Sequence, residues 1–156
     1  MIKKIFALMM IVAVISFLGF IVENLWLLVT KGYMDNRGMI FPFLIGYGLA
    51  VLCIYCLFGT PKKLRFLGKV IYIKSKVLRI LFYFVMVMLC ICIGEILLGK
   101  LVEKTCYFCW WDYSKIPLHI TQYTSIPTSA GFSILIVIFM STMFMPLYEY
   151  FLSWLI

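Results

Sequence analysis

The sequence predicts an all-α integral membrane protein, a four-transmembrane-helix bundle with a basic amphipathic cytoplasmic connection. Of its 156 residues, 65% are hydrophobic and only 13% are charged, and the mean hydropathy of +1.11 is far above that of a soluble domain. Four apolar runs each reach the ~20 residues that a helix needs to cross the hydrocarbon core of a bilayer. The connections between the runs are too short for a second domain, so we expect one membrane domain over residues 1–156.

The four spans are expected in chain order. They cover about residues 5–29, 39–59, 80–102 and 126–152, with outer loops at 30–38 and 103–125 and a cytoplasmic basic loop at 60–79. The first run resembles a secretory signal, because Lys3 and Lys4 precede its apolar core. It has no small-x-small cleavage site and stays apolar to residue 29, so we interpret it as an uncleaved span. Pro146 is expected to kink the fourth span.

The positive charge is concentrated in one connection. There are 14 Lys and Arg residues against 6 Asp and Glu residues, a net charge of +8. Residues 60–79 contain no acidic residue and carry Lys62, Lys63, Arg65, Lys69, Lys74, Lys76 and Arg79. Basic loops face the cytoplasm, which also fits Lys3 and Lys4, so both termini are predicted to be cytoplasmic. The lipid bilayer is then the partner of this charge, and no nucleic-acid partner is expected.

The basic loop shows a helical pattern. At about 100° per residue, one side of a helix gathers Lys62, Arg65, Lys69, Lys76 and Arg79, with apolar residues opposite. This pattern predicts an amphipathic helix at the membrane surface, although the β-branched run 69–74 could equally form a strand. The basic residues could contact anionic lipid or form a docking surface for a cytoplasmic protein, and both alternatives stay open.

Carboxylates inside the apolar runs indicate a polar site. An acidic group costs ~3 kcal/mol at the centre of a membrane helix, so Glu23 should face the bundle and have a partner. Glu95, Gly99 and Glu103 recur every four residues and therefore share one helical face.

The first outer loop is predicted to be a tight hairpin. Asp35 is a turn former, and Pro42 suits the first turn of the second span. Gly46 and Gly48 follow, and they leave room for another backbone to approach the second span closely.

Polar residues from several segments share one predicted membrane depth near the outer boundary. The candidate solute or proton site comprises Glu23, Asn24, Asn36, Arg37, Glu95, Glu103, Asp112, Tyr113 and Ser114. Such clusters commonly mark ion, proton or substrate pathways. A structural interpretation is also open, because Asp112 could cap a turn and Arg37 could pair with a glutamate only to satisfy it.

The stretch CYFCWWDYS, residues 106–114, lies in the second outer loop. Trp110 and Trp111 could form an outer aromatic cap or merely an interfacial aromatic belt. We expect the stretch to act as a lid that sets Asp112 over the carboxylates. Cys106 and Cys109 have C-x-x-C spacing without a nearby His or Cys to complete a tetrahedral set. No metal is therefore expected, and a disulfide and two free thiols remain alternatives.

Sequence motifs for catalysis are missing. No G-x-S-x-G, H-E-x-x-H or P-loop motif occurs, and His119 is the only histidine. The chain therefore has no ATPase or hydrolase motif, no cofactor is expected, and ATP-driven transport would need a separate ATPase subunit. Glu95 and Glu103 could still perform acid–base chemistry on a lipid-linked substrate, which keeps a lipid-modifying enzyme among the hypotheses.

Four sequence blocks occur in a specific order: GFIVENLW, DNRGMIFPFLIGYG, GEILLGKLVEK and WWDYSKIPLHI. In order and spacing they resemble the blocks of the ABC-transporter permease family of type IV, or CmpB-like family, of small bacterial multi-pass proteins. The resemblance covers about residues 17–132. It implies family positions at Glu23, Asn36, Arg37, Gly38, Pro42, Tyr47, Gly48, Glu95, Glu103, Trp110, Asp112, Tyr113, Ser114 and Pro117.

The chain departs from the family pattern in two places. After WWDYS the segment HITQYTSI lacks the arginine of the family block, and the basic loop is longer than the family's short connection. The resemblance implies a permease-like subunit of the bacterial cell membrane that moves or gates a small solute with a separate ATPase subunit. A homo-oligomer is expected because four short spans enclose little volume. The alternative is a non-transporting adaptor or sensor whose basic loop recruits a cytoplasmic protein or anionic lipid.

Overall fold

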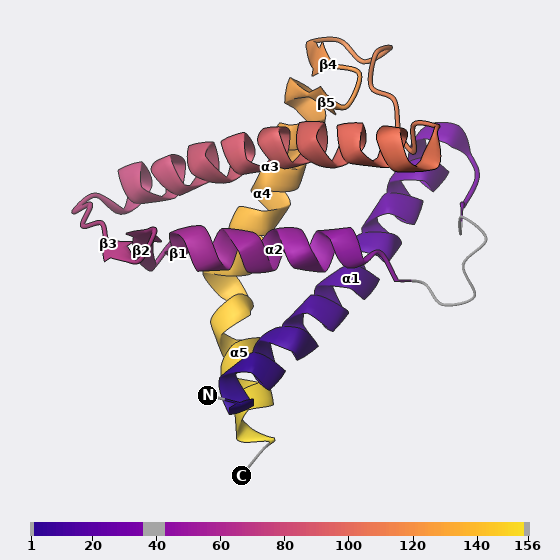
Figure 1. Cartoon of the computed structure of the whole chain (residues 1–156). Coiled ribbons are helices and arrows are strands. Elements are labelled where there is room, and N and C mark those ends of the chain that lie inside the picture. Colours follow the sequence, from indigo (N-terminus) through magenta and orange to yellow (C-terminus); the bar gives the residue numbers. More distant parts are fainter. Residues whose placement is uncertain (1, 36–42, 155–156) are drawn as a thin grey trace. The chain divides into compact units, whose positions relative to one another are not determined.

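The computed structural model describes residues 2–35 and 43–154 (Figure 1). These residues contain the helices α1 (Ile2–Lys31), α2 (Ile45–Phe58), α3 (Lys76–Cys106), α4 (Ile126–Thr142) and α5 (Phe144–Ser153). Short strands occupy two connections: β1 (Gly59–Thr60), β2 (Lys63–Phe66) and β3 (Lys69–Val70) before α3, and β4 (His119–Thr121) and β5 (Thr124–Ser125) before α4. The chain divides into two compact units, Met1–Tyr55 with Thr142–Ile156, and Cys56–Ser141.

In the first unit, α1 packs against α5 and against the start of α2. α1 is a 30-residue apolar helix, long enough to cross a bilayer. Lys3 and Lys4 at its start border the same shallow hollow as Leu152 of α5. The N–H of Leu44, just before α2, donates to the carbonyl oxygen of Ser16 at 3.1 Å. The beginning of α2 is thereby tied to the middle of α1.

α2 is shorter than the span predicted at 39–59. Its 14 residues rise about 21 Å, whereas the hydrocarbon core is about 30 Å thick. Residues 43–44 are not helical, and 36–42 lie outside the described residues, as does most of the predicted outer hairpin with Pro42. The second span is therefore not confirmed.

In the second unit, the limits of α3 follow from its caps. The hydroxyl of Ser75 accepts the N–H of Leu78 at 3.4 Å at the N-terminus. Tyr107 follows the C-terminus in the left-handed region, with φ 61°, and its N–H donates to the Glu103 carbonyl oxygen at 2.9 Å. The resulting helix has 31 residues and extends beyond the predicted span 80–102 at both ends.

The prediction of an amphipathic helix in the basic loop is wrong. β1, β2 and β3 form a small antiparallel sheet there, in the order β1-β2-β3. Pro61 and Lys62 connect the first two strands, and Leu67 and Gly68 connect the next two with φ of 48° and 86°. Two positive φ values in a two-residue loop are typical of a type I′ hairpin turn. Turn-forming residues thus outweighed the helical spacing of the charges.

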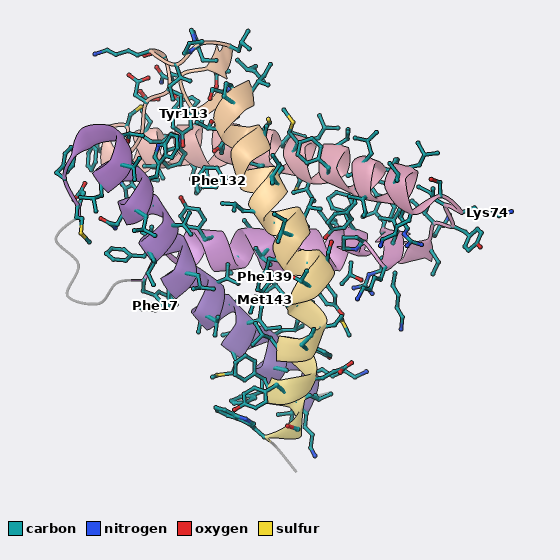
Figure 2. The ribbon with its side chains drawn as sticks, turned by 180° about the vertical axis from the view of Figure 1, so that it is seen from behind. Phe17, Lys74, Tyr113, Phe132, Phe139 and Met143 are labelled. Carbon is teal, nitrogen blue, oxygen red and sulfur yellow. The ribbon has the colours of Figure 1, made fainter. Side chains whose placement is uncertain are left out.

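The basic residues consequently do not share one helical face. Lys62 lies in a turn, Arg65 on β2, Lys69 on β3, and Lys76 and Arg79 in the first turn of α3. A strand was the alternative prediction for residues 69–74, and it is confirmed only for Lys69 and Val70, which form β3. Lys74 points outward from the connection before α3 (Figure 2).

The last apolar run is broken at Met143, between α4 and α5. Pro146 explains the position of the break, because it has no N–H for the Thr142 carbonyl and its ring crowds that carbonyl. The N–H of Leu147 donates to the Met143 carbonyl oxygen at 3.0 Å, so helical bonding resumes at once. The interruption predicted from Pro146 is thus found one turn before the proline.

Within the described residues, α1 and α3 are long and apolar enough to cross a membrane, and α4 with α5 would form a third span if they count as one. Many apolar side chains on these helices are exposed, such as Phe17 (Figure 2), which suits contact with lipid. The fold is therefore that of a helical membrane protein. The complete four-span bundle and the cytoplasmic position of the basic connection stay predictions.

Candidate functional site

Glu95 of α3 is held by two hydroxyl groups from β5 and α4. The hydroxyl of Thr124 donates to Glu95 Oε2 at 2.5 Å, and that of Ser129 donates to the same oxygen at 3.0 Å. The two hydroxyl oxygens are 2.9 Å apart, and both residues are fully buried. We call Glu95, Thr124 and Ser129 the Glu95 site. A carboxylate among fixed hydroxyl donors can exchange a proton or bind a solute that carries hydrogen-bonding groups or positive charge.

Further hydroxyl groups lie in β5 and along the first half of α4. Ser125 and Ser133 are fully buried, and the Ser133 hydroxyl donates to the Ser129 carbonyl oxygen at 2.6 Å. The hydroxyl oxygens of Ser125 and Thr128 lie 2.6 Å apart. Small hydroxyl residues allow membrane helices to approach closely and provide hydrogen bonds between them. The polar character of this region therefore extends beyond the Glu95 site.

Glu103 contacts the same connection two turns further along α3. It accepts a hydrogen bond from the hydroxyl of Tyr123 and one from Gln122 Nε2 at 3.4 Å. The ring of Tyr123 lies against Gly99, where an added Cβ would be 2.4 Å from the ring atom Cδ1. The prediction that Glu95, Gly99 and Glu103 share one face is confirmed, because all three meet the segment that leads into α4.

Asp112 caps a turn in the connection between α3 and β4. Its Oδ1 accepts the N–H of Ser114 at 2.8 Å, and this bond lowers the pKa of Asp112 below its ordinary value. Asp112 is exposed, so its role as a lid over the carboxylates stays a prediction. Trp111 Nε1 donates to the carbonyl oxygen of Tyr123 at 2.8 Å, whereas Trp110 is exposed. Of the two tryptophans, Trp111 therefore bonds to the tyrosine that lies beside Glu103.

Cys106 and Cys109 are free thiols in the structure. Gln122 Nε2 donates to Cys109 Sγ at 3.7 Å, which brings Cys109 close to the Glu103 carboxylate. Desolvation, followed by that carboxylate, raises the pKa of the Cys109 thiol. Among residues 2–35 and 43–154, no three His, Cys, Asp or Glu side chains come together as ligands for a metal ion.

In the first unit, Glu23 has the partner that its position in α1 requires. Its Oε2 accepts the hydroxyl of Tyr47 at 2.9 Å, and Glu23 is half-buried. Asn24 is buried, accepts the N–H of Asp35 at 2.8 Å, and donates to the Phe20 carbonyl oxygen at 3.1 Å. The prediction of a partner for Glu23 is confirmed, and Asn24 fixes the chain that leaves α1.

The start of α2 lies close to α1 at two glycines. The ring of Tyr47 lies against Gly19, where a Cβ would be 2.6 Å from ring atom Cγ. A Cβ on Gly48 would be 2.3 Å from the Val12 carbonyl oxygen. Gly46 has no neighbour within 4 Å at the same position. The close approach predicted for Gly46 and Gly48 is therefore confirmed for Gly48 and wrong for Gly46.

The predicted polar residues form two groups in the described structure. Glu23 and Asn24 belong to the first unit, and Glu95, Glu103, Asp112, Tyr113 and Ser114 belong to the second. Asn36 and Arg37 lie outside the described residues. One cluster that unites both groups stays a prediction.

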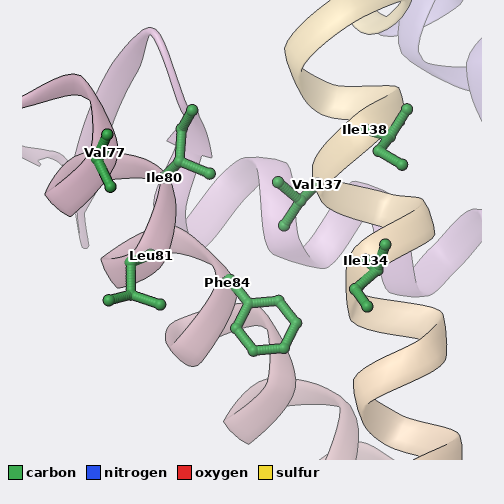
Figure 3. Close-up of a pocket in the computed structure, with 7 residues that line it drawn as sticks. All are labelled: Val77, Ile80, Leu81, Phe84, Ile134, Val137 and Ile138. Carbon is green, nitrogen blue, oxygen red and sulfur yellow. The ribbon is translucent and has the colours of Figure 1, made fainter.

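An apolar groove lies between α3 and α4 (Figure 3). It is lined by Val77, Ile80, Leu81, Phe84, Ile134, Val137 and Ile138. These side chains offer no polar anchor, so the groove suits an acyl chain or a lipid-facing surface rather than a polar solute. The Glu95 site is therefore the stronger candidate for polar recognition.

Thr124, Ser129 and Tyr123 are not among the site residues predicted from the sequence. A signal for the tyrosine contact was nevertheless present, because LGFIVE (18–23) and LGKLVE (98–103) share the same glycine and glutamate. Each of these segments lies before a connection that brings a tyrosine back to it. No comparable local pattern marks Thr124 and Ser129, since hydroxyl residues are common at helix starts.

Long apolar helices and a carboxylate held among buried hydroxyls define a helical membrane protein with an internal polar site. The chain belongs to the family described as "Putative ABC-transporter type IV", which it matches over residues 10–156. The expected family relationship is thereby confirmed, and the chain is an ABC-transporter-related membrane protein. Comparisons with curated proteins and with solved structures gave no match.

Proposed function

We propose that the chain is a permease-like membrane subunit that moves or gates a small solute, with ATP hydrolysis supplied by a separate ATPase chain. The observation that carries this proposal is the Glu95 site, a carboxylate with two hydroxyl partners in a helix of spanning length. A carboxylate costs ~3 kcal/mol at the centre of a membrane helix, whereas an apolar residue would be favourable there. The chain belongs to an ABC-transporter-related family over residues 10–156, which supports transport as the function of this carboxylate.

The proposed topology has four spans in the bacterial cell membrane and both termini in the cytoplasm. The hollow shared by Lys3, Lys4 and Leu152 supports termini on one side of the bilayer. The positive-inside rule favours the cytoplasm for those lysines and for the basic connection. α2 would cross as a short span, which requires the adjoining apolar residues or local thinning of the bilayer. Because four spans enclose little volume, the working form would be a homo-oligomer.

The basic connection would be the contact for the ATPase. Lys62, Lys63, Lys69 and Lys74 are exposed on the small sheet and the segment that follows it. The same exposed charge also favours a second candidate function, an adaptor that recruits a cytoplasmic protein or anionic lipid without transport. Transport that depends on Glu95 separates these two functions, because an adaptor does not need the Glu95 site.

The first experiment tests transport of a solute whose identity is not yet established. The complex of this chain with its ATPase is reconstituted into liposomes, supplied with a metabolite extract and ATP, and the liposome contents are compared by mass spectrometry. We expect at least one solute to be moved by the wild-type complex and not by Glu95→Gln. Glu149→Gln is the matched control, because Glu149 is exposed on α5. Equal transport by wild type and Glu95→Gln would refute the assignment of the Glu95 site.

The second experiment tests the contact with the ATPase. The full chain is purified from its own cells, and ATP hydrolysis is measured in the purified fraction. Replacing Lys62, Lys63, Lys69 and Lys74 together by serine should abolish co-purification of ATPase activity. Replacing Lys100 and Lys104, which are exposed on α3, should leave it unchanged. Absence of ATPase activity in the wild-type fraction would shift support to the adaptor.

A further inference from the structure

The contact of Tyr123 with α3 has two parts. Its ring occupies the space left by Gly99, and its hydroxyl donates to Glu103 one turn further along the helix. An alanine at position 99 would collide with the ring, because the added Cβ would be 2.4 Å from Cδ1. We call this arrangement the Gly–Tyr–Glu contact. It fixes Tyr123 both along α3 and around it.

The first unit contains the same arrangement. The ring of Tyr47 lies over Gly19, with 2.6 Å between the added Cβ and ring atom Cγ, and its hydroxyl donates to Glu23 at 2.9 Å. Glycine and glutamate again stand four residues apart, within LGFIVE in one case and LGKLVE in the other. Leucine, glycine, valine and glutamate are identical in these segments. The two units share four identical residues in these segments and the same tyrosine contact to them. We therefore interpret the contacts as two copies of one structural motif.

The residues around the two contacts differ in one respect. In the second unit, Glu95 stands four residues before the glycine, and Thr124 and Ser129 stand one and six residues after the tyrosine. The corresponding residues of the first unit are Ile15, Gly48 and Cys53. The Gly–Tyr–Glu contact therefore occurs in both units, whereas the Glu95 site occurs in the second alone among these matched positions.

We propose that Tyr123 is a positioning residue for the Glu95 site. Thr124 follows Tyr123 directly, so the seat of the ring on Gly99 and the bond to Glu103 determine where the Thr124 hydroxyl meets Glu95. In the first unit the residue after the matching tyrosine, Gly48, likewise lies directly against the preceding long helix, beside the Val12 carbonyl oxygen. Glu103 accordingly holds Tyr123, and the Glu95 site takes the solute or proton. This assignment rests on the proposed function.

The test measures how well Glu95 is shielded, so it needs no solute. The full chain in lipid nanodiscs is treated with a water-soluble carbodiimide and glycine ethyl ester, and modification of Glu95 is quantified by peptide mass spectrometry. Tyr123→Phe should increase the modification rate by about fivefold, the factor that corresponds to one net hydrogen bond. Tyr47→Phe is the matched control, because it removes the equivalent hydroxyl from the first unit. We expect Glu95 to be modified at the wild-type rate in this variant.

Two variants of Glu103 separate positioning from general loss of structure. Glu103→Gln keeps an acceptor for the tyrosine hydroxyl and should retain the wild-type rate at Glu95, whereas Glu103→Leu should behave like Tyr123→Phe. This pair also replaces Tyr123→Phe if that variant does not fold. An unchanged rate in both Tyr123→Phe and Glu103→Leu, or an equal increase in Tyr47→Phe, would overturn the proposal. Labelling does not depend on transport, so the two tests can fail separately. If labelling gives the expected rates but the Glu95→Gln complex still transports solute, the proposed function is refuted and the positioning role of Tyr123 is retained.

Discussion

Gly48 at the start of α2 lies directly against the carbonyl oxygen of Val12 in α1, and an added Cβ would be 2.3 Å from that oxygen. The hydroxyl of Ser16 would be 2.5 Å from the same Cβ, and it is itself bonded to the Val12 carbonyl oxygen at 2.7 Å. The obstacle is backbone, which cannot move aside as a flexible side chain can. The approach of α2 to α1 therefore depends on the missing side chain of Gly48.

Gly48→Ala should destabilise the first unit. Forcing one methyl group into a packed contact typically costs about 1–3 kcal/mol. Gly46→Ala, two residues earlier in the same helix, should change stability by less than about 0.5 kcal/mol, because nothing lies within 4 Å of its added Cβ. The measurement is the free energy of unfolding in mixed detergent micelles. Equal effects of the two substitutions would contradict the close contact.

The bond between Thr124 and Glu95 should be visible as an energetic coupling. In a double-mutant cycle with Thr124→Val and Glu95→Leu, we expect about 1 kcal/mol of coupling in the free energy of unfolding, within the range of hydrogen bonds between membrane helices. Ser141→Ala combined with Glu95→Leu is the control cycle, because the Ser141 hydroxyl bonds to Val137 of its own helix. A coupling that does not differ from the control would contradict the Glu95 site.

The lengths of the apolar runs predicted the two long helices α1 and α3 well, but they predicted the connections between helices poorly. α1 and α3 were expected as spans because a long apolar run has few alternatives in lipid. The limits of α3 depend on Ser75 and Tyr107, which are local capping effects that a hydropathy profile does not register. The small sheet was missed because the charges of the basic connection have helical spacing, while Pro61 and Gly68 determine its turns.

The sequence identified the acidic half of the site and not its partners. Glu23 and Glu95 could be recognised because a carboxylate within an apolar run is unfavourable without a partner. Their partners, Tyr47 for Glu23 and Thr124 and Ser129 for Glu95, are distant in sequence. Their positions depend on how each connection returns to the preceding helix, and ordinary hydroxyl residues give no local sign of it.

Cys109 should react slowly with alkylating agents at neutral pH. Desolvation and then the Glu103 carboxylate raise the pKa of its thiol, and the thiolate is the reactive form. The pH midpoint of iodoacetamide labelling at Cys109 should therefore lie above the ordinary value of about 8.5. Glu103→Gln should lower this midpoint only in part, since desolvation is the larger cause. A midpoint at or below the ordinary value in the wild-type chain would contradict the environment described for this thiol.

The turn capped by Asp112 should open only in strong acid. The Ser114 N–H stabilises the carboxylate and lowers the pKa of Asp112 below its reference value of 3.8. A group with a lowered pKa in the folded state stabilises that state above its unfolded pKa, and the contribution is lost as the pH falls through the folded value. The turn should therefore persist at neutral pH and open below about pH 3.8. Tryptophan fluorescence from the neighbouring Trp110 and Trp111 should report this transition in an acid titration. Asp112→Asn keeps an oxygen acceptor that does not titrate, so the same transition in that variant would rule out Asp112 as its origin.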